Sequence, residues 1–161
     1  MRRRTSGNMV LEGILWIPVI VLLVVGTIQL GKISYTYYSL RKAVFTAARY
    51  LAVQQGTDVC NLGGDANVQA ALNLAVNDPN SQTPLISGLT ADNFLISTEC
   101  VDPASNTVGA CLCGGVDGEQ RPDYIVVSVT GFSIQPRIPG LTLDPIALSP
   151  SVTVAFGGSS L

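Results

Sequence analysis

The sequence predicts an α+β fold in which a long N-terminal helix, transmembrane at first and then amphipathic, packs on a small, mainly antiparallel β-sheet head. Three observations predict it. Residues 13–30 carry no charge and span about 27 Å as a helix, close to the roughly 30 Å core of a bilayer. Apolar residues then recur every three or four positions as far as Leu51. Finally, three later segments have the composition and alternation of half-buried strands.

The amphipathic part of the helix continues to about Gln55 and offers apolar surface on more than one side. One stripe with helical spacing consists of Ile33, Tyr37, Leu40, Val44, Ala47 and Leu51. Four aromatic residues lie off this stripe: Tyr35, Tyr38, Phe45 and Tyr50. The stripe can therefore pack on the head of the same chain while another face meets other chains. A plain stalk helix would explain the stripe but not the extra aromatic residues.

The rest of the chain predicts one short helix and three strands. Asp65 is a suitable N-cap for a helix over residues 66–76, and Pro79 follows its end. The predicted strands are residues 93–100, 124–130 and 151–156. Four prolines break the stretch between the last two strands into turns and edges, namely Pro136, Pro139, Pro145 and Pro150.

The charge balance argues against a nucleic-acid partner. The 161 residues are 47% apolar and only 12% charged, against roughly 25% charged in an average soluble domain. Nine basic and eleven acidic residues give a net charge of −2. Without residues 1–7, six basic and eleven acidic residues remain, which is a net charge of −5. Proteins that bind nucleic acids carry a basic face instead.

The order of segments predicts an orientation in the membrane. A basic leader at residues 1–7 precedes a helix at residues 8–55, whose transmembrane part is residues 13–30, and an α/β head at residues 56–161. The positive-inside rule keeps the three leader arginines in the cytoplasm, so we expect the head to be extracytoplasmic. The alternative is a secretory signal peptide cut after Gly26, but the apolar run continues past this residue into the amphipathic helix.

The start of the apolar run carries a pattern that is more specific than hydrophobicity. Gly7 lies five positions before Glu12, an acid that stays wet at the headgroups or costs about 2–3 kcal/mol to bury. This pattern resembles the type IV filament precursors, and among them the TadE-like pseudopilins of the tight-adherence pilus system. The resemblance is carried by Gly7, Glu12, Pro18, Gly26, Gly31, Tyr38, Ala47, Ala48, Arg49 and Tyr50. It covers the first third of the chain, is loose in the last quarter, and is nearly absent between them. Asn8 and Met9 depart from the apolar or aromatic residues that are usual there.

The resemblance implies a structural, pilin-like subunit. It implies a prepilin in the inner membrane that a prepilin peptidase cuts between Gly7 and Asn8. The mature chain would then join other pilin subunits, through the inner-membrane assembly machinery, in an extracellular pilus. The new amine of Asn8 would pair with Glu12 of a neighbouring subunit. Pro18, which frees the carbonyl of Ile14, would belong to the same assembly helix.

The four cysteines predict disulfides rather than a metal site. An even number of cysteines in an exported domain favours disulfides. Cys111 and Cys113 are too close in the chain to pair readily, so we expect Cys60 and Cys100 each to take one of them. The chain has no histidine and no C-x-x-C pair, so we expect no zinc and no cofactor. The acids around residues 99–123 leave calcium as an alternative to a solvated acidic loop.

Catalysis has little support in the sequence. Histidine, the commonest general base, is absent, and no phosphate loop, dinucleotide fingerprint or nucleophile elbow occurs. A tethered hydrolase would have to use Asp117 and Glu119, which lie in a Gly-rich loop. A second alternative is a membrane-anchored binding or adhesin domain that does not polymerise and recognises its target through residues 114–122. We expect a protein that is not an enzyme.

Overall fold

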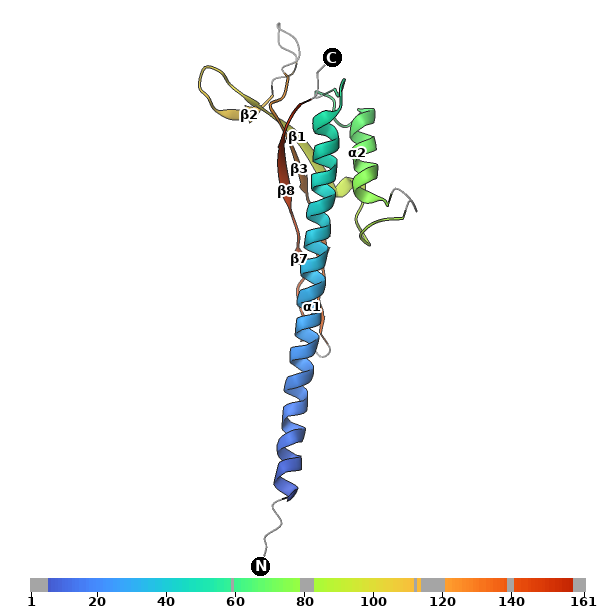
Figure 1. Cartoon of the computed structure of the whole chain (residues 1–161), viewed down its shortest axis with the longest axis vertical. Coiled ribbons are helices and arrows are strands. Elements are labelled where there is room, and N and C mark those ends of the chain that lie inside the picture. The colour runs from blue at the N-terminus through green and yellow to red at the C-terminus, as the bar shows by residue number, and fades with distance from the viewer. Residues whose placement is uncertain are drawn as a thin grey trace, which may run out of the picture. The chain divides into compact units, whose positions relative to one another are not determined.

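The computed structural model describes residues 6–58, 60–78, 83–111, 113, 121–138 and 141–157. These residues form a long apolar N-terminal helix and a small antiparallel sheet, which confirms the predicted α+β class (Figure 1). The chain divides into two compact units, Met1–Tyr35 with Ile134–Ile146 and Thr36–Ser133 with Ala147–Leu161. Helix α1 (Ser6–Val53) contributes residues to both units.

The first unit combines the N-terminal part of α1 with a short hairpin. The hairpin consists of β5 (Arg137–Ile138) and β6 (Leu141–Thr142), which pair antiparallel. The Gln29 side chain of α1 donates a hydrogen bond of 2.7 Å to the carbonyl of Arg137. A second short pair, β4 (Ser133–Ile134) with β7 (Ile146–Ala147), lies at the boundary of the units. The proline-rich stretch thus forms two-residue strands, where the sequence predicted only turns and edges.

The second unit contains a four-stranded sheet in the order β2-β1-β3-β8. Its strands are β1 (Phe94–Val101), β2 (Val108–Ala110), β3 (Tyr124–Val129) and β8 (Ser151–Ala155). All three pairings are antiparallel, with Ile96 opposite Val127 and Val127 opposite Val152. The three predicted strands are present, with ends that differ by one residue. β2 was not predicted, because its three residues are all exposed and show no alternation.

The core of the second unit lies between the central strand and the helices. In β3, Ile125, Val127 and Val129 are buried, and the residues between them are half-buried. The predicted helical stripe is buried from Leu40 onward, whereas Tyr37 is 44% exposed. The alanines beside the stripe are also buried, because small side chains permit close approach: Ala43, Ala48 and Ala52. The spacing of the apolar residues in the sequence therefore identified the face of α1 that builds the core.

Helix α2 (Ala66–Val76) has the bounds predicted from the sequence. The carboxylate of Asp65 accepts hydrogen bonds from the backbone N–H groups of Asn67 and Val68, so it is the N-cap. The buried face contains Val68, Ala71 and Ala75. A 3-10 turn, η1 (Ala91–Asn93), then leads into β1.

The end of α1 is fixed by the end of β8. The helix stops at Val53, two residues before the predicted Gln55. The N–H of Gly157 donates a hydrogen bond of 2.8 Å to the carbonyl of Ala52, which would otherwise lack a partner in the last turn. Gly56 has a φ of 74°, a conformation that glycine adopts at little cost, and it turns the chain away from the helix.

Candidate functional site

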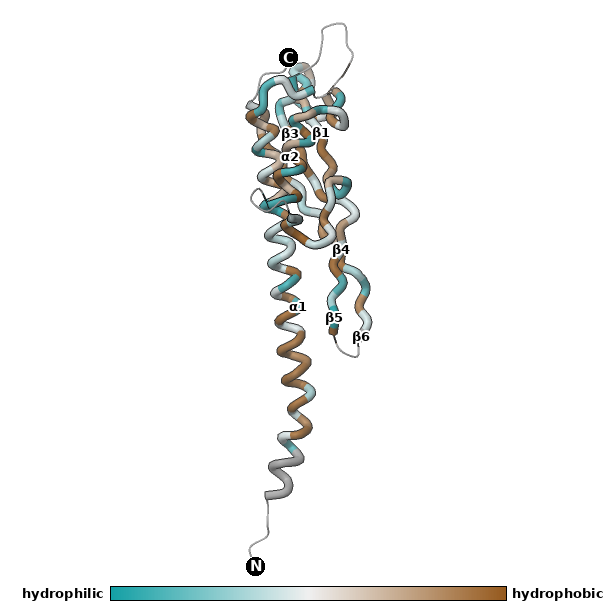
Figure 2. The backbone as a smooth tube through the Cα atoms, turned by 90° about the vertical axis from the view of Figure 1, so that its right-hand side faces the viewer, coloured by the Kyte–Doolittle hydropathy of each residue, from teal (hydrophilic) through white to brown (hydrophobic). Residues whose placement is uncertain are grey.

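The N-terminal part of α1 exposes apolar side chains along its whole length. Apart from Val25, which is half-buried, its large apolar residues between Ile14 and Leu30 are 44% to 75% exposed. Figure 2 shows this part of the helix as an almost unbroken apolar segment. In the described part of the chain, one helix, Glu12–Val53, is long and apolar enough to cross a membrane. Burial of each such side chain is worth about 1.5–3 kcal/mol, so a bilayer or other helices would stabilise this surface.

The residues that the sequence predicted for processing and assembly all lie on α1. Gly7 and Asn8 are in the first turn of α1, Glu12 is exposed, and Pro18 lies inside the helix. No described residue forms an ion pair or hydrogen bond with the Glu12 carboxylate. A Cβ atom placed at Gly13, Gly26 or Gly31 would meet nothing within 4 Å. Since small residues let helices approach closely in membranes, α1 is open to a second helix at each of these glycines.

Two disulfides connect the loops of the head. Cys60 pairs with Cys113, 53 positions away, and Cys100 pairs with Cys111, 11 positions away. Each bond joins one of the two closely spaced cysteines to a more distant one, an arrangement that the sequence favoured. Disulfides are thus confirmed, and no described cysteine is free. The Cys100–Cys111 bond also spans β1 and the end of β2, which explains why so short an outer strand stays paired.

The acidic residues near β2 accept hydrogen bonds from nearby backbone and side-chain groups. The Asp102 carboxylate accepts hydrogen bonds from the Ser105 hydroxyl at 2.7 Å and the Ala104 N–H at 2.9 Å. These bonds, that of Ser105 first, lower the pKa of Asp102 below its ordinary value. Asp123 accepts a hydrogen bond of 2.6 Å from the N–H of Val101. Among the described residues no group of three or more acids, cysteines or histidines could hold a metal ion. Asp117, Glu119 and the other residues from 114 to 120 of the proposed recognition loop at 114–122 lie outside the described residues.

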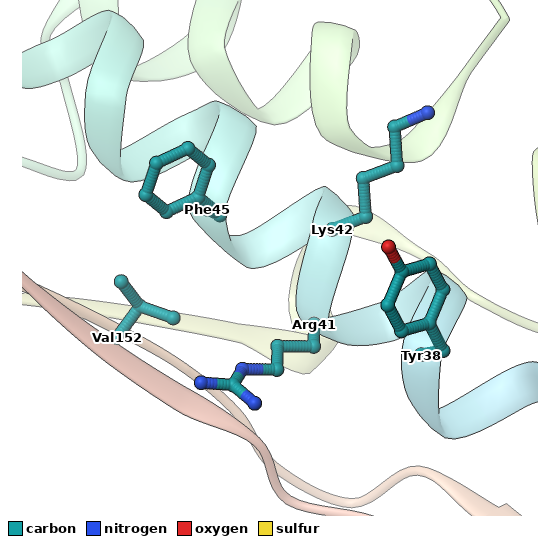
Figure 3. A pocket seen from close by; sticks show the side chains of 5 residues that line it. All are labelled: Tyr38, Arg41, Lys42, Phe45 and Val152. Carbon is teal, nitrogen blue, oxygen red and sulfur yellow. The ribbon is translucent and has the colours of Figure 1, made fainter. Parts of the chain in front are cut away.

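A groove opens between α1 and the outer strand β8. It encloses about 390 Å³ and is lined by Tyr38, Arg41, Lys42 and Phe45 of α1 and Val152 of β8 (Figure 3). We call this the Tyr38 groove. The sequence analysis did not identify it as a site, although the spacing of its four helical residues already places them on one face. The contribution of Val152 could not be inferred, because it depends on β8 lying beside α1.

An exposed apolar helix that leads into a small disulfide-bonded head suggests a protein that is anchored in a membrane by this helix. The family model for TadE-like protein matches residues 7–49, which covers nearly all of α1. This part of the chain is similar to TadE-like proteins, and the resemblance inferred from the sequence is confirmed over that range. The TadE-like family suggests a pilin-like protein of the Tad pilus, structural rather than catalytic and associated with pilus components. No curated protein and no solved structure matches the chain.

Proposed function

We propose that this chain is a structural subunit of a Tad-type pilus that is assembled through its N-terminal helix. One observation carries the proposal: the TadE-like match at residues 7–49 coincides with α1, whose apolar surface between Ile14 and Leu30 is largely exposed. The hydrophobic effect favours removal of this surface from water. A bilayer covers it before assembly, and the helices of neighbouring subunits replace the lipid afterwards.

In this proposal the chain has three functional parts. Residues 1–7 are a leader that stays in the cytoplasm, residues 8–55 are the membrane and assembly helix, and residues 56–161 form the extracytoplasmic head. A prepilin peptidase cuts after Gly7 and so removes three arginines, whose charges would hold the segment on the cytoplasmic side. The partners are other pilin subunits and the inner-membrane assembly machinery.

The cut also creates the partner that the Glu12 carboxylate lacks among the described residues. The new α-amine of Asn8 and the carboxylate of Glu12 have opposite charges at the start of an apolar helix. Within a low-dielectric bundle an unpaired charge is costly, so pairing between neighbouring subunits favours a single axial register. Pro18 lies in the same helix as Asn8 and Glu12.

The decisive experiment is the N-terminal sequence and intact mass of the chain, expressed with and without a prepilin peptidase. We expect a start at Asn8 that depends on the peptidase, and recovery of the chain in sheared filaments. A start at Thr27 would indicate an ordinary secreted domain. Retention of the arginines in both conditions, with the chain confined to membranes, would indicate a permanently anchored adhesin instead.

Replacement of Glu12 tests the charge pairing. Glu12→Ala and Glu12→Gln should both insert in the membrane and be processed, but neither should enter filaments, because both lack the negative charge. Glu12→Asp keeps the charge and should retain part of the assembly. The measurement is the amount of each variant in the sheared-filament and membrane fractions. Normal piliation by Glu12→Gln would contradict the pairing.

A further inference from the structure

The Tyr38 groove combines exposed aromatic surface with positive charge. Tyr38 is 71% exposed and Phe45 47% exposed, although both lie next to the core of the head. Arg41 and Lys42 are also exposed, and no described residue forms an ion pair with either. Figure 3 shows Arg41 reaching toward the strand that carries Val152, whereas Lys42 extends away from it. Tyrosine and arginine are the residue types that most often dominate protein–protein interfaces.

The charges of the chain are separated along the sequence. Between Gly13 and Thr57 there is no acid, and the bases are Lys32, Arg41, Lys42 and Arg49. From Asp58 to the C-terminus there are ten acids and only two bases, Arg121 and Arg137. A second copy of this chain therefore offers the negative charge that the groove lacks.

The negative charge lies at the far edge of the same sheet. In the order β2-β1-β3-β8 the groove adjoins β8 at one edge, and β2 forms the other. Beside β2, Glu99 of β1 is opposite Ala110, and Asp102 opens the turn between β1 and β2. We call these two acids and the strand β2 the acidic edge. The Ser105 hydroxyl helps to keep the pKa of Asp102 low, so this carboxylate is charged at neutral pH.

We propose that the Tyr38 groove receives the acidic edge of a second copy of this chain. The two surfaces differ and lie at opposite edges of one sheet, so the contact is heterologous and leaves a free groove and a free edge at its ends. Repetition of such a contact gives a ring or an open polymer, and only the polymer fits a filament. The inference rests on the proposed function and extends it, because it assigns a contact between heads in addition to the packing of the N-terminal helices.

The chemistry of the two surfaces gives each a separate role. Tyr38, Phe45 and Val152 supply apolar contact area, which stabilises the bound state. The opposite charges orient the approaching subunit and disfavour contacts between two grooves or two acidic edges, because like charges would then meet. Salt should weaken the contact, since exposed charges are screened within about 8 Å at physiological ionic strength.

Photo-crosslinking in the full-length chain tests the contact directly. The probe p-benzoyl-phenylalanine replaces Phe45 in the membrane-inserted protein, and Leu74, exposed on α2, is the control position. We expect the Phe45 probe to give a dimer whose linked peptide contains residues 94–111, and the Leu74 probe to give no link to that peptide. A link from Phe45 to lipid or to another protein alone, or no link, overturns the proposal. The same link from Leu74 also overturns it, because the contact would then be nonspecific.

A charge exchange tests the pairing without loss of the fold. Arg41→Glu and Glu99→Lys should each reduce the dimer yield about tenfold, which corresponds to about 1.4 kcal/mol, and the double variant should recover it. Arg49→Glu changes an exposed base on the same helix outside the groove and should leave the yield unchanged. Intact disulfides and membrane insertion identify the variants that fold. If the double variant folds and does not recover, the proposal is wrong.

The failure of this contact and the failure of the proposed function give different results. If the chain enters sheared filaments but the Phe45 probe gives no self-link, the contact between heads is wrong and the pilus function stands. If the probe links to residues 94–111 but the chain never leaves the membrane, the contact stands and the pilus function is wrong.

Discussion

Two carboxylates at the residue scale fix the loop that follows α1. Asp65 accepts a hydrogen bond of 2.8 Å from the N–H of Asp58, in addition to those that cap α2. Asp58 in turn accepts hydrogen bonds from the N–H groups of Cys60 and Asn61. A single chain of hydrogen bonds therefore connects the first turn of α2 with the backbone of Cys60, which forms a disulfide with Cys113.

Replacement of the N-cap should destabilise α2. Asp65→Ala removes the acceptor of three backbone N–H groups and should lower the free energy of unfolding by about 1–2 kcal/mol. Asp65→Asn keeps an acceptor oxygen and should recover most of this loss. Amide hydrogen exchange of the first turn of α2 measures the effect. Equal protection in the alanine variant and the unchanged chain would rule out this role for the cap.

The Asp102 turn should respond to pH through Ser105. Because its folded pKa is below the ordinary value, the charged carboxylate stabilises the turn above that ordinary pKa. The stabilisation is lost as the pH falls through the folded pKa. Ser105→Ala removes the largest cause and should raise the pKa of Asp102 toward its ordinary value, measured by carbon NMR of the carboxyl group. Ser97→Ala, a change at an exposed serine of β1, should leave the titration unchanged.

At the element scale, α1 is a helix with two different environments. Its residues from Gly13 to Leu30 are uncharged, mostly apolar and largely exposed, whereas from Leu40 to Ala52 one face is buried. The short side chains of Ala43, Ala47 and Ala48 are buried beside the larger Leu40 and Val44. One element therefore serves as a candidate membrane anchor in its first half and as part of the head core in its second half.

A cavity in the second half should destabilise the head. Leu40 is fully buried, so Leu40→Ala should lower the free energy of unfolding by about 2–5 kcal/mol. Leu74→Ala removes the same atoms from a side chain that is 38% exposed and should cost clearly less. Urea unfolding in detergent, followed by tyrosine fluorescence, compares the two variants. Similar losses would show that the buried stripe of α1 does not anchor the head.

Elements with a clear period could be predicted from the sequence, and short ones could not. α1, α2 and three strands show helical or alternating patterns, and Asp65 marked the start of α2. β2 and the strands between residues 133 and 147 have two or three residues each, too few for a period. The even number of cysteines predicted the disulfides. The spacing of Gly7 and Glu12 predicted the family resemblance over residues 7–49. The Tyr38 groove needed Val152, which lies more than a hundred positions from Phe45, so only the fold could show it.

At the scale of the whole molecule, the two disulfides determine how the chain can respond to tension. The segment between Cys60 and Cys113 contains α2, η1, β1 and β2, and the Cys100–Cys111 bond lies within it. A force applied through α1 and the C-terminal strand passes from Cys60 to Cys113 through the disulfide. These four elements therefore bear no load along the chain.

The Cys60–Cys113 disulfide limits how far a pulled subunit can lengthen. At 3.3–3.6 Å per extended residue, the 53-residue interval keeps roughly 175–190 Å of chain out of the extension. Optical tweezers attached at the two ends should record an unfolding step shorter by roughly 140–150 Å in the oxidised chain than in Cys60→Ser, because the Cys100–Cys111 bond of the variant still withholds 11 of the 53 residues. Equal steps would show that the bond does not carry the load. A subunit built in this way yields only part of its length under traction, so fibres of the proposed kind would lengthen less under load than fibres of subunits without this bond.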